Sequence, residues 1–457
     1  MAVQLNYTAP KGWKPNPEKY IIVLFKIELA DGVPKSRFLD AAASVAAESS
    51  TGTWTEVYAG KHSGMGNAKK YRAMVFDVDK KRNMFKVAYP LDLFELGNIS
   101  GFLAGPAGNI AGMKMLKGLR IMDMRFPKRF VLSFPGPRYG IGGLRKMLGH
   151  KGIFAEMPVI GTVPKPKIGR TDVEQALLAR QLFLSGDGSY NFIKDDENLT
   201  SLKFSNFYRR TVLVLNEIKK AEKRTGHKKL YLANISHSSV DEMLRRSWCI
   251  KNNGGRAMML DIVVTGFAAL HTMRLKTGLF IHAHRAMHGF MTRESGSGIH
   301  GKGRLQGFSV SMLTLAKIYR LLGVDSLHIG SPKAKMEDYG EAAVIAEAIT
   351  TNTTPQREGT LGQEWYGTKS VWPVASGGLH PGVLDKVVSV LGHDIIIQMG
   401  GGVLGHPDGI SAGVEAALQA RRAVAQGVSI EKFVKANPYS PLAKAVEKWG
   451  YGPKIVY

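Results

Sequence analysis

The sequence has little cysteine, no long apolar run and few acidic residues. One cysteine, Cys249, occurs among 457 residues, which excludes an intrachain disulfide and a cysteine-based metal site and suits a reducing compartment. No run of about 18 or more apolar residues is present, so no membrane span is expected. Residues 1–20 contain no apolar signal core, and we therefore expect a cytoplasmic protein.

Because acidic residues are few, the formal net charge is +25, from 62 Lys and Arg against 37 Asp and Glu. Such a balance predicts anionic partners. The basic residues are dispersed, as in 218–224, and no zinc-finger, homeodomain or RNP-type motif occurs. Nucleic acid is therefore not favoured as a partner, and a binding module for nucleic acid stays open on charge alone.

Short apolar strands alternate with longer amphipathic stretches from residue 137 onward, the pattern of repeated β-α units. Eight candidate strands can be counted, at 157–163, 189–194, 229–235, 258–264, 278–284, 326–330, 370–376 and 394–400. We therefore predict an α/β protein with a (β/α)₈ TIM barrel over 137–430. A C-terminal helical extension over 431–457 would follow the barrel.

Residues 1–136 follow a different pattern. Strand-like runs at 20–29, 71–79 and 84–91, with helical patterns at 38–49 and near 109–120, predict a smaller α+β, ferredoxin-like N-terminal domain. The turn at 48–54 places hydroxyl side chains and glycine between two elements. This composition suits phosphate contact and equally a plain loop.

The stretch FIKDDEN, residues 192–198, runs from apolar residues into one lysine and three carboxylates. By itself the run is either a solvated loop or a binding site, because adjacent carboxylates repel one another unless water, a cation or an ammonium group compensates. In a barrel, the residues that follow the strands form one ring, where the chemistry of this fold takes place. Lysines, carboxylates, histidines and glycine runs all occupy that ring here, which favours a site.

Lys194 and Asp196 lie two residues apart and point to the same side of a strand, and Glu197 can reach the same point. The two carboxylates supply part of the oxygen shell that Mg²⁺ requires. The amine of Lys194 suits such a site only as its CO₂ adduct, an anionic carbamate. Carbamate formation needs a neutral amine, so the pKa of Lys194 must lie well below its usual value. The alternative is a plain ion pair between Lys194 and Asp196.

Glycine runs follow the last two strands, at 376–378 (Ser-Gly-Gly) and 400–402. Backbone N–H groups in such runs can approach an anion closely, and barrel enzymes commonly hold phosphate there. Arg285 and His328 could hold a second phosphate. Two phosphate sites across one metal indicate a sugar bisphosphate, although a single glycine run by itself would be better explained as a tight turn.

Together these segments resemble the large chain of ribulose-1,5-bisphosphate carboxylase/oxygenase (RuBisCO), most like the archaeal form III enzymes, over nearly the whole chain. The motifs that carry the resemblance are VAAESSTGTWT (45–55), GTVPKPKIG (161–169), FIKDDEN (192–198), HAHRAMH (282–288) and QMGGGVLGHPDG (398–409). The resemblance implies carboxylation, with competing oxygenation, of ribulose 1,5-bisphosphate to 3-phosphoglycerate through a Mg-bound enediolate. Its implied cofactors are Mg²⁺ and an activating CO₂ carried as a carbamate on Lys194.

The resemblance also implies a role for each matching residue. The metal ligands would be Lys194 as its carbamate, Asp196 and Glu197. The catalytic residues would be Lys165, Lys194, His284, Lys335, Glu48 and Asn109. The substrate contacts would be Thr53, Trp54, Lys167, Arg285, His328, Ser376, Gly377, Gly378, Gly400 and Gly401. Because Glu48, Thr53, Trp54 and Asn109 match residues that complete the site of a neighbouring subunit, a homodimer or a higher oligomer of dimers is implied, with a sugar bisphosphate, CO₂ and O₂ as small-molecule partners.

The mobile loop after the sixth strand departs from the family pattern. Ala334 and Asp338 stand where the family usually has glycine, and Pro332 restricts the backbone. Lid closure and the discrimination between CO₂ and O₂ are therefore the properties expected to differ. A glycine-rich segment, 294–307, is longer than the usual connection and is interpreted as a surface loop.

An alternative function is a RuBisCO-like enzyme that enolises or isomerises a related phosphosugar without fixing CO₂. Such relatives generally lose several of the catalytic residues, whereas this chain keeps the set of Lys165, Lys194, Asp196, Glu197, His284 and Lys335. The complete set favours an authentic carboxylase.

Overall fold

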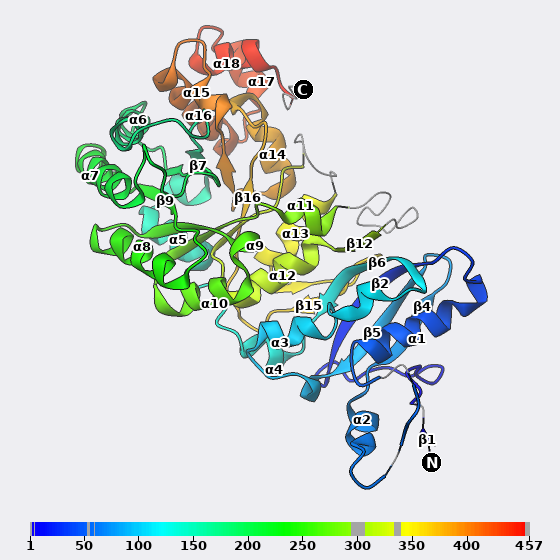
Figure 1. Cartoon of the computed structure of the whole chain (residues 1–457). Coiled ribbons are helices and arrows are strands. Elements are labelled where there is room, and N and C mark those ends of the chain that lie inside the picture. Colours follow the sequence, from blue (N-terminus) through cyan, green and yellow to red (C-terminus); the bar gives the residue numbers. More distant parts are fainter. Residues whose placement is uncertain are drawn as a thin grey trace. The chain divides into compact units, whose positions relative to one another are not determined.

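The structure of the chain is a computed structural model that describes residues 2–3, 5–52, 55–58, 60–293, 307–332 and 340–452. Contacts divide the chain into two compact units. The first unit contains residues 1–134, 287–321 and 351–368, and the second contains 135–286, 322–350 and 369–457. The domain boundaries predicted at 136/137 and 430/431 stay predictions. Figure 1 labels the elements of both units.

The second unit is built on a closed barrel of eight parallel strands, which confirms the predicted fold class. Strands that follow one another along this unit are neighbours in the barrel, in the order β10-β11-β13-β16-β17-β7-β8-β9. They are β7 (Val159–Thr162), β8 (Phe192–Lys194), β9 (Leu230–Asn234), β10 (Ala257–Asp261), β11 (Phe280–His284), β13 (Ser326–His328), β16 (Trp372–Ala375) and β17 (Ile396–Gln398). Each strand overlaps one of the eight apolar runs in the sequence.

One predicted strand is too long. The sequence predicts a strand over 258–264, but β10 ends at Asp261 and the helix α9 (Ile262–Thr265) begins there. Ile262 is buried in that helix. The apolar run therefore continues past the strand because the helix that follows is also partly buried. For this reason the sequence alone does not show that Asp261 is the last residue of the strand.

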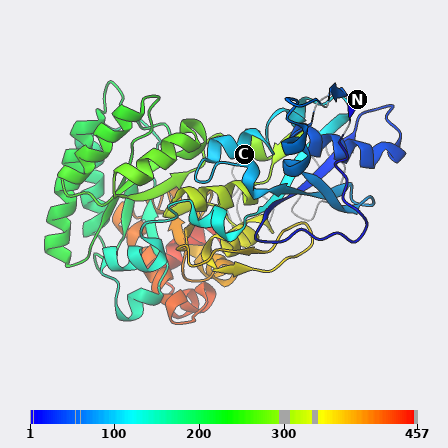
Figure 2. The ribbon, with the colours of Figure 1, turned by 90° about the horizontal axis from the view of Figure 1, so that it is seen from below.

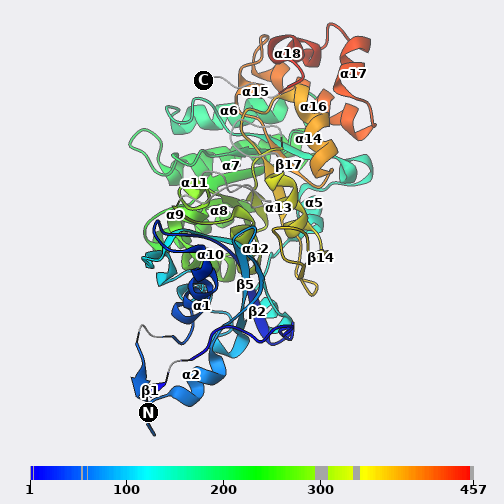
Figure 3. The ribbon, with the colours of Figure 1, turned by 90° about the vertical axis from the view of Figure 1, so that its right-hand side faces the viewer.

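Helices surround the barrel strands (Figure 2). In the second unit they are α5 (Gly140–Leu148), α6 (Asp172–Leu184), α7 (Phe207–Thr225), α8 (Val240–Asn252), α9, α10 (Phe267–Lys276), α13 (Glu341–Thr350), α14 (Leu384–Leu391), α15 (Gly401–Leu404), α16 (Ile410–Ala425), α17 (Ile430–Ala436) and α18 (Pro441–Trp449), with 3₁₀ turns at Gly152–Glu156 and Pro381–Val383. The last three α-helices pack against one another (Figure 3). No helix in the described part of the chain is long and apolar enough to cross a membrane.

Local sequence signals start and stop the two long helices that flank β8. At α6, Thr171 Oγ1 accepts the backbone N–H of Glu174 while the Glu174 carboxylate accepts that of Thr171, a reciprocal capping box. At α7, Asn206 caps the first turn, and Gly226 ends the helix with φ of 73°. That left-handed conformation is the one that glycine adopts without steric cost.

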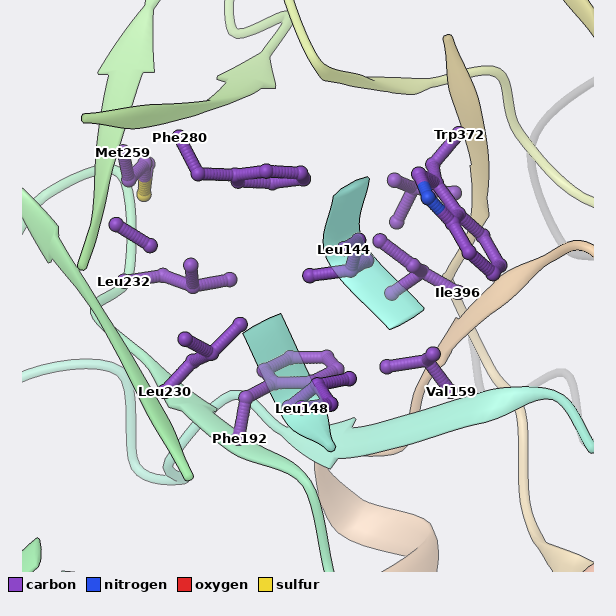
Figure 4. Close-up of a cluster of buried hydrophobic side chains, with 12 residues drawn as sticks. Leu144, Leu148, Val159, Phe192, Leu230, Leu232, Met259, Phe280, Trp372 and Ile396 are labelled. Carbon is purple, nitrogen blue, oxygen red and sulfur yellow. The ribbon is translucent and has the colours of Figure 1, made fainter. Parts of the chain in front are cut away.

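The amino-terminal end of the barrel is closed by an apolar plug (Figure 4). Leu144 and Leu148 of α5 pack against buried side chains of the strands. Seven of these come from the first residue of a strand: Val159, Phe192, Leu230, Ala257, Phe280, Trp372 and Ile396. Because this layer fills one end of the barrel, the polar residues that follow the strands are left at the opposite, carboxyl end.

The first unit contains a five-stranded sheet in the order β12-β6-β2-β5-β4. Its strands are β2 (Tyr20–Leu29), β4 (Met74–Asp79), β5 (Met84–Pro90), β6 (Leu116–Arg125) and β12 (Gly307–Val310). The helices are α1 (Phe38–Glu48), α2 (Met65–Tyr71), α3 (Ile99–Ala104), α4 (Lys128–Leu132), α11 (His288–Thr292) and α12 (Met312–Leu322), whose last residue belongs to the second unit. Short pairs β1 (Ala2–Val3) with β3 (Val57–Tyr58) and β14 (Thr353–Thr354) with β15 (Gln363–Glu364), and 3₁₀ turns at Lys35–Arg37, Leu91–Leu93 and Asn109–Gly112, complete it.

The helix predicted near 109–120 is wrong. Residues Asn109–Gly112 form a 3₁₀ turn, and β6 begins at Leu116. Most of β6 is buried, because the strand pairs with β2 on one side and with β12 on the other. Apolar side chains on both of its faces resemble helical spacing in the sequence, and tertiary pairing decides the structure.

The apolar plug predicts an unequal cost for two leucine truncations in the second unit. Leu144→Ala should destabilise the protein by about 2–5 kcal/mol, because it leaves a cavity among side chains that are almost fully buried. Leu177 in α6 is 53% exposed. Leu177→Ala should therefore change stability by less than about 0.5 kcal/mol. Urea denaturation of both variants measures the difference, and equal losses would contradict the assignment of α5 as the plug.

Candidate functional site

The carboxyl ends of the barrel strands carry the polar residues singled out in the sequence. Lys165 and Lys167 follow β7, and Lys194 ends β8, two residues before Asp196 and three before Glu197. Asn234, Asp261, His284, His328 and Gln398 are the last residues of β9, β10, β11, β13 and β17. The barrel topology therefore brings residues from seven strands to one end.

Two lysines from the loop after β7 contact the two carboxylates after β8. Lys165 Nζ lies 3.1 Å from Asp196 Oδ2, and Lys167 Nζ lies 3.8 Å from Asp196 Oδ1. Lys167 also donates to Glu197. Burial raises the pKa of Glu197, but the hydrogen bond from Lys167 and the charge interaction with His284 oppose burial and help lower the pKa to about 2. Glu197 thus keeps its negative charge beside the ammonium group of Lys167.

The Lys194 side chain is buried, and its Nζ donates to the backbone carbonyl of Asp195 at 2.8 Å. Burial lowers the pKa of Lys194 to about 8, and the nearby carboxylates, Asp261 first, offset this only in part. The pKa of Lys194 is thus shifted in the direction that carbamate formation requires. No ion pair joins Lys194 and Asp196, because the carboxylate contacts Lys165 and Lys167 instead.

Three imidazoles lie at this end of the barrel. His284 Nδ1 lies 2.8 Å from Asp261 Oδ1, while its Nε2 lies 3.9 Å from Glu197 Oε2. His328 Nδ1 lies 3.0 Å from Ser376 Oγ, and its Nε2 lies 3.1 Å from His282 Nε2. Burial lowers the pKa of all three histidines, so we expect neutral rings near pH 7.

The two glycine runs require glycine at particular positions. Gly377 and Gly378 have φ of 98° and 70°, a conformation that side chains disfavour. A Cβ at Gly402 would lie 2.4 Å from the carbonyl oxygen of Leu379, and one at Gly400 would lie 3.0 Å from that of Val163. Close backbone approach explains Gly400 and Gly402, and the backbone conformation explains Gly377 and Gly378.

The family model described as ribulose bisphosphate carboxylase large chain, catalytic domain, matches residues 140–449, and that of the N-terminal domain matches residues 8–130. The chain belongs to this family. The resemblance found in the sequence is thereby confirmed.

Archaeal members of the RuBisCO family are similar along almost their full length. The ribulose bisphosphate carboxylase of Methanocaldococcus jannaschii is 44% identical over 89% of this chain and 92% of its own. That of Thermococcus onnurineus is 40% identical, with 98% and 97% covered. Among solved structures, a dimeric archaeal Rubisco from Hyperthermus butylicus matches with a TM-score of 0.85 and 38% identity, covering 96% of this chain and 98% of that one.

An octameric Rubisco from Pyrococcus horikoshii matches with a TM-score of 0.82 and 36% identity, covering 98% of this chain and 99% of that one. Solved relatives of this RuBisCO family member therefore include both a dimer and an octamer.

The remaining residues that the RuBisCO resemblance singled out fall in three groups. Glu48 ends α1 and Asn109 begins a 3₁₀ turn in contact with that helix, both exposed and both in the first unit. Arg285 is buried after β11. Thr53, Trp54, Lys335 and the two lid positions Ala334 and Asp338 lie outside the described residues, as do residues 294–306 of the long connection.

Sequence reasoning missed Asp261, which the structure places against His284. Its other oxygen, Oδ2, accepts from Asn234 Nδ2 and from Ser236 Oγ, each at 3.2 Å. A correct end for β10 would have placed Asp261 on the same ring as the other polar residues. Gln398, whose Nε2 lies 2.9 Å from His282 Nε2, was missed because it belongs to an apolar run.

The pKa of Lys194 predicts how fast the protein takes up CO₂. Only the neutral amine attacks CO₂, so the rate at fixed dissolved CO₂ should rise about tenfold per pH unit below pH 8 and level off above it. Trapping of labelled CO₂ on the protein from about pH 6.5 to about 9.5 measures this profile. Lys194→Arg should trap no label, and a rate still rising steeply at the upper limit would contradict the lowered pKa.

Proposed function

We propose that this chain carboxylates ribulose 1,5-bisphosphate, and in competition oxygenates it, with carboxylation giving 3-phosphoglycerate. As a member of the RuBisCO family it is an enzyme, and its archaeal relatives are named ribulose bisphosphate carboxylase. The observation that carries the proposal is the buried Lys194 amine, with its pKa near 8, beside two carboxylates that attract cations. This arrangement supports a lysine that is modified before catalysis.

The residues present fit a carbamate and a divalent cation. The Lys194 nitrogen would form a bond to the carbon of CO₂ and lose one proton to solvent, which converts the amine into an anionic oxygen ligand. In the described part of the chain, no three His, Cys, Asp or Glu side chains form a metal-binding group. Once carbamylated, Lys194 would add a third anionic oxygen ligand beside Asp196 and Glu197.

Bound to these three groups, Mg²⁺ would supply polarisation of the substrate ketone. The carbamate of Lys194 would then remove the neighbouring C3 proton, leaving an enediolate that adds to CO₂. Hydration of the product and cleavage of a carbon–carbon bond would give two molecules of 3-phosphoglycerate. Lys165 would protonate the final carbanion, and Lys335 would stabilise the new carboxylate.

The geometry around His284 supports a second proton-transfer group. Asp261 accepts a hydrogen bond from Nδ1 of His284, so the neutral imidazole carries its proton on Nδ1 and keeps a lone pair on Nε2. Nε2 is the atom nearer to Glu197. His284 would therefore accept a proton from substrate or water at Nε2, and Asp261 would hold the ring in that tautomer.

Polar groups around the same end support two phosphate sites. Lys167, Gly377, Gly378, Gly400 and Gly401 would form one. Arg285 and His328 would form the other, together with Ser376, whose hydroxyl lies 3.0 Å from His328 Nδ1. The backbone conformation or a close contact requires glycine in both runs, and glycine has no side chain that could block the backbone N–H groups from an anion. The formal charge of +25 favours a doubly phosphorylated substrate over a neutral sugar.

A homodimer, or a higher oligomer of dimers, is the assembly we propose. Two solved relatives are named as dimeric and octameric. Glu48, Thr53, Trp54 and Asn109 would complete the site of the neighbouring subunit from the first unit.

The alternative is a phosphosugar enolase or isomerase of the same family that does not fix CO₂. Ala334 and Asp338, which stand where the family usually has glycine, are the departures from the family sequence that keep this alternative open. The two functions share the first proton removal and differ in whether a carbon–carbon bond forms.

Incubation with ribulose 1,5-bisphosphate, labelled bicarbonate and Mg²⁺ tests the proposal. We expect label in the carboxyl group of 3-phosphoglycerate, and none with Lys194→Ala or Lys194→Arg, because a guanidinium forms no carbamate. Lys203→Ala is the control: it alters an exposed lysine in the loop that follows β8 and should retain activity. Exchange of the C3 proton with solvent without fixation of label would favour the isomerase, and full activity of either Lys194 variant would overturn the carbamate.

A shared active site predicts complementation between two inactive variants. Subunit exchange between Glu48→Gln and Lys194→Ala chains at equal concentration should restore about a quarter of the parental activity, because half of the dimers are mixed and each carries one intact site. Each variant alone is the control. Demonstrated exchange without recovery would place Glu48 and Lys194 in the same subunit's site.

A further inference from the structure

The middle carboxylate of the three after β8 points away from the proposed metal ligands. Asp195 is fully buried, and its two oxygens lie 2.8 and 2.9 Å from the hydroxyl of Tyr231. Its Oδ2 also accepts from Arg210 at 3.2 Å and from the backbone N–H of Asn234 at 3.1 Å. Consecutive residues at a strand end point to opposite faces, which turns Asp195 outward while Asp196 turns to the lysines.

Arg210 of α7 fixes the loop that follows the carboxylates. Its guanidinium is fully buried and donates to the carbonyl oxygens of Thr200 at 2.7 Å and of Ser205 at 3.1 Å. Its Nε donates to the hydroxyl of Tyr231 at 3.1 Å. The carboxylate, guanidinium and phenol therefore bind one another and join the loop to α7 and to β9.

The same network constrains the backbone of the reactive residues. The Asp195 carbonyl accepts from Lys194 Nζ, and the Asp195 N–H donates to the carbonyl of Leu232 at 3.0 Å. Asn234 Nδ2 donates to the Glu197 carbonyl at 3.1 Å. A shift of Asp195 would thus move the amine of Lys194 and both carboxylates together.

We propose that Asp195, held by Arg210 and Tyr231, is the positioning residue that preorganises Lys194, Asp196 and Glu197 for CO₂ and a divalent cation. The inference rests on the proposed function. Arg210 also neutralises Asp195, so only two of the three adjacent negative charges face the site. Groups that orient metal ligands from behind typically change metal affinity by roughly 10- to 100-fold when they are altered.

Tyr231→Phe is the first test, because it removes the phenol oxygen from the network and leaves the Asp195–Arg210 ion pair in place. Carbamate on the protein is measured by ¹³C NMR with labelled bicarbonate as Mg²⁺ is increased, without any substrate. We expect the Mg²⁺ concentration for half-maximal carbamate to rise roughly tenfold or more.

Tyr190→Phe is the matched control. Tyr190 is also fully buried, and its hydroxyl bonds Thr162 Oγ1 at 2.7 Å, away from Asp195 and Arg210. We expect a comparable decrease in melting temperature for both phenylalanine variants and a shift in the Mg²⁺ midpoint only for Tyr231→Phe. A purely structural role of Tyr231 predicts that both midpoints stay where the parent has them.

A second variant guards against a failure to fold. Asp195→Asn alone would leave a buried guanidinium without its counter-charge, a change that typically costs about 3–5 kcal/mol. The double variant Asp195→Asn with Arg210→Gln removes both charges and keeps polar groups in place. It should fold and show the same weakened response to Mg²⁺.

The outcomes separate this inference from the proposed function. If the parent protein forms no Mg²⁺-dependent carbamate, the proposed function fails and this inference fails with it. If the parent forms the carbamate and both Tyr231→Phe and the double variant match its Mg²⁺ midpoint, the positioning role of Asp195 is overturned and the proposed function stands.

Discussion

Closure of eight parallel strands around a filled end determines where polar groups can lie in the second unit. The first residues of seven strands and two leucines of α5 form a dry layer at the amino-terminal end. A charged side chain placed there would lose its hydration without a partner, at a cost that burial of apolar surface does not offset. The charged side chains on the barrel strands, Lys194 and Asp261, are each the last residue of their strand, and the site depends on this division.

Strand geometry then divides the charges of FIKDDEN between two environments. Lys194 and Asp196 face the site, whereas Asp195 faces α7 and is neutralised by Arg210. Burial without a paired carboxylate is what lowers the pKa of Lys194, because desolvation acts more strongly on this amine than the surrounding negative charges do. A lysine in the same sequence on an exposed loop would stay protonated, so its reactivity comes from the barrel.

The sequence predicted the fold class and the residues that gather at one end of the barrel, because both follow from a periodic pattern. The alternation of apolar runs located eight strands, and their ends located Lys165, Lys194 and His284. The pattern failed where apolar residues continued past a structural boundary. The run through 264 concealed Asp261 at the end of β10. The partners of Asp195 were equally invisible, because Arg210 lies on a helix whose approach to β8 depends on packing and not on spacing along the chain.

Electrostatic balance links the present arrangement of the site to the chemistry proposed for it. Lys165 and Lys167 contact Asp196 and Glu197, so two positive and two negative charges cancel locally. The two ammonium groups would lose these partners once the carboxylates coordinate a divalent cation. Starting from the neutral amine, a carbamate on Lys194 would add one negative charge against the two positive charges of the ion, which leaves the site one charge more positive; starting from the ammonium, the net charge of the site stays the same. Lys165 and Lys167 would then be free to face a bisphosphate, and activation would prepare the site for substrate by releasing cations that the protein already holds there.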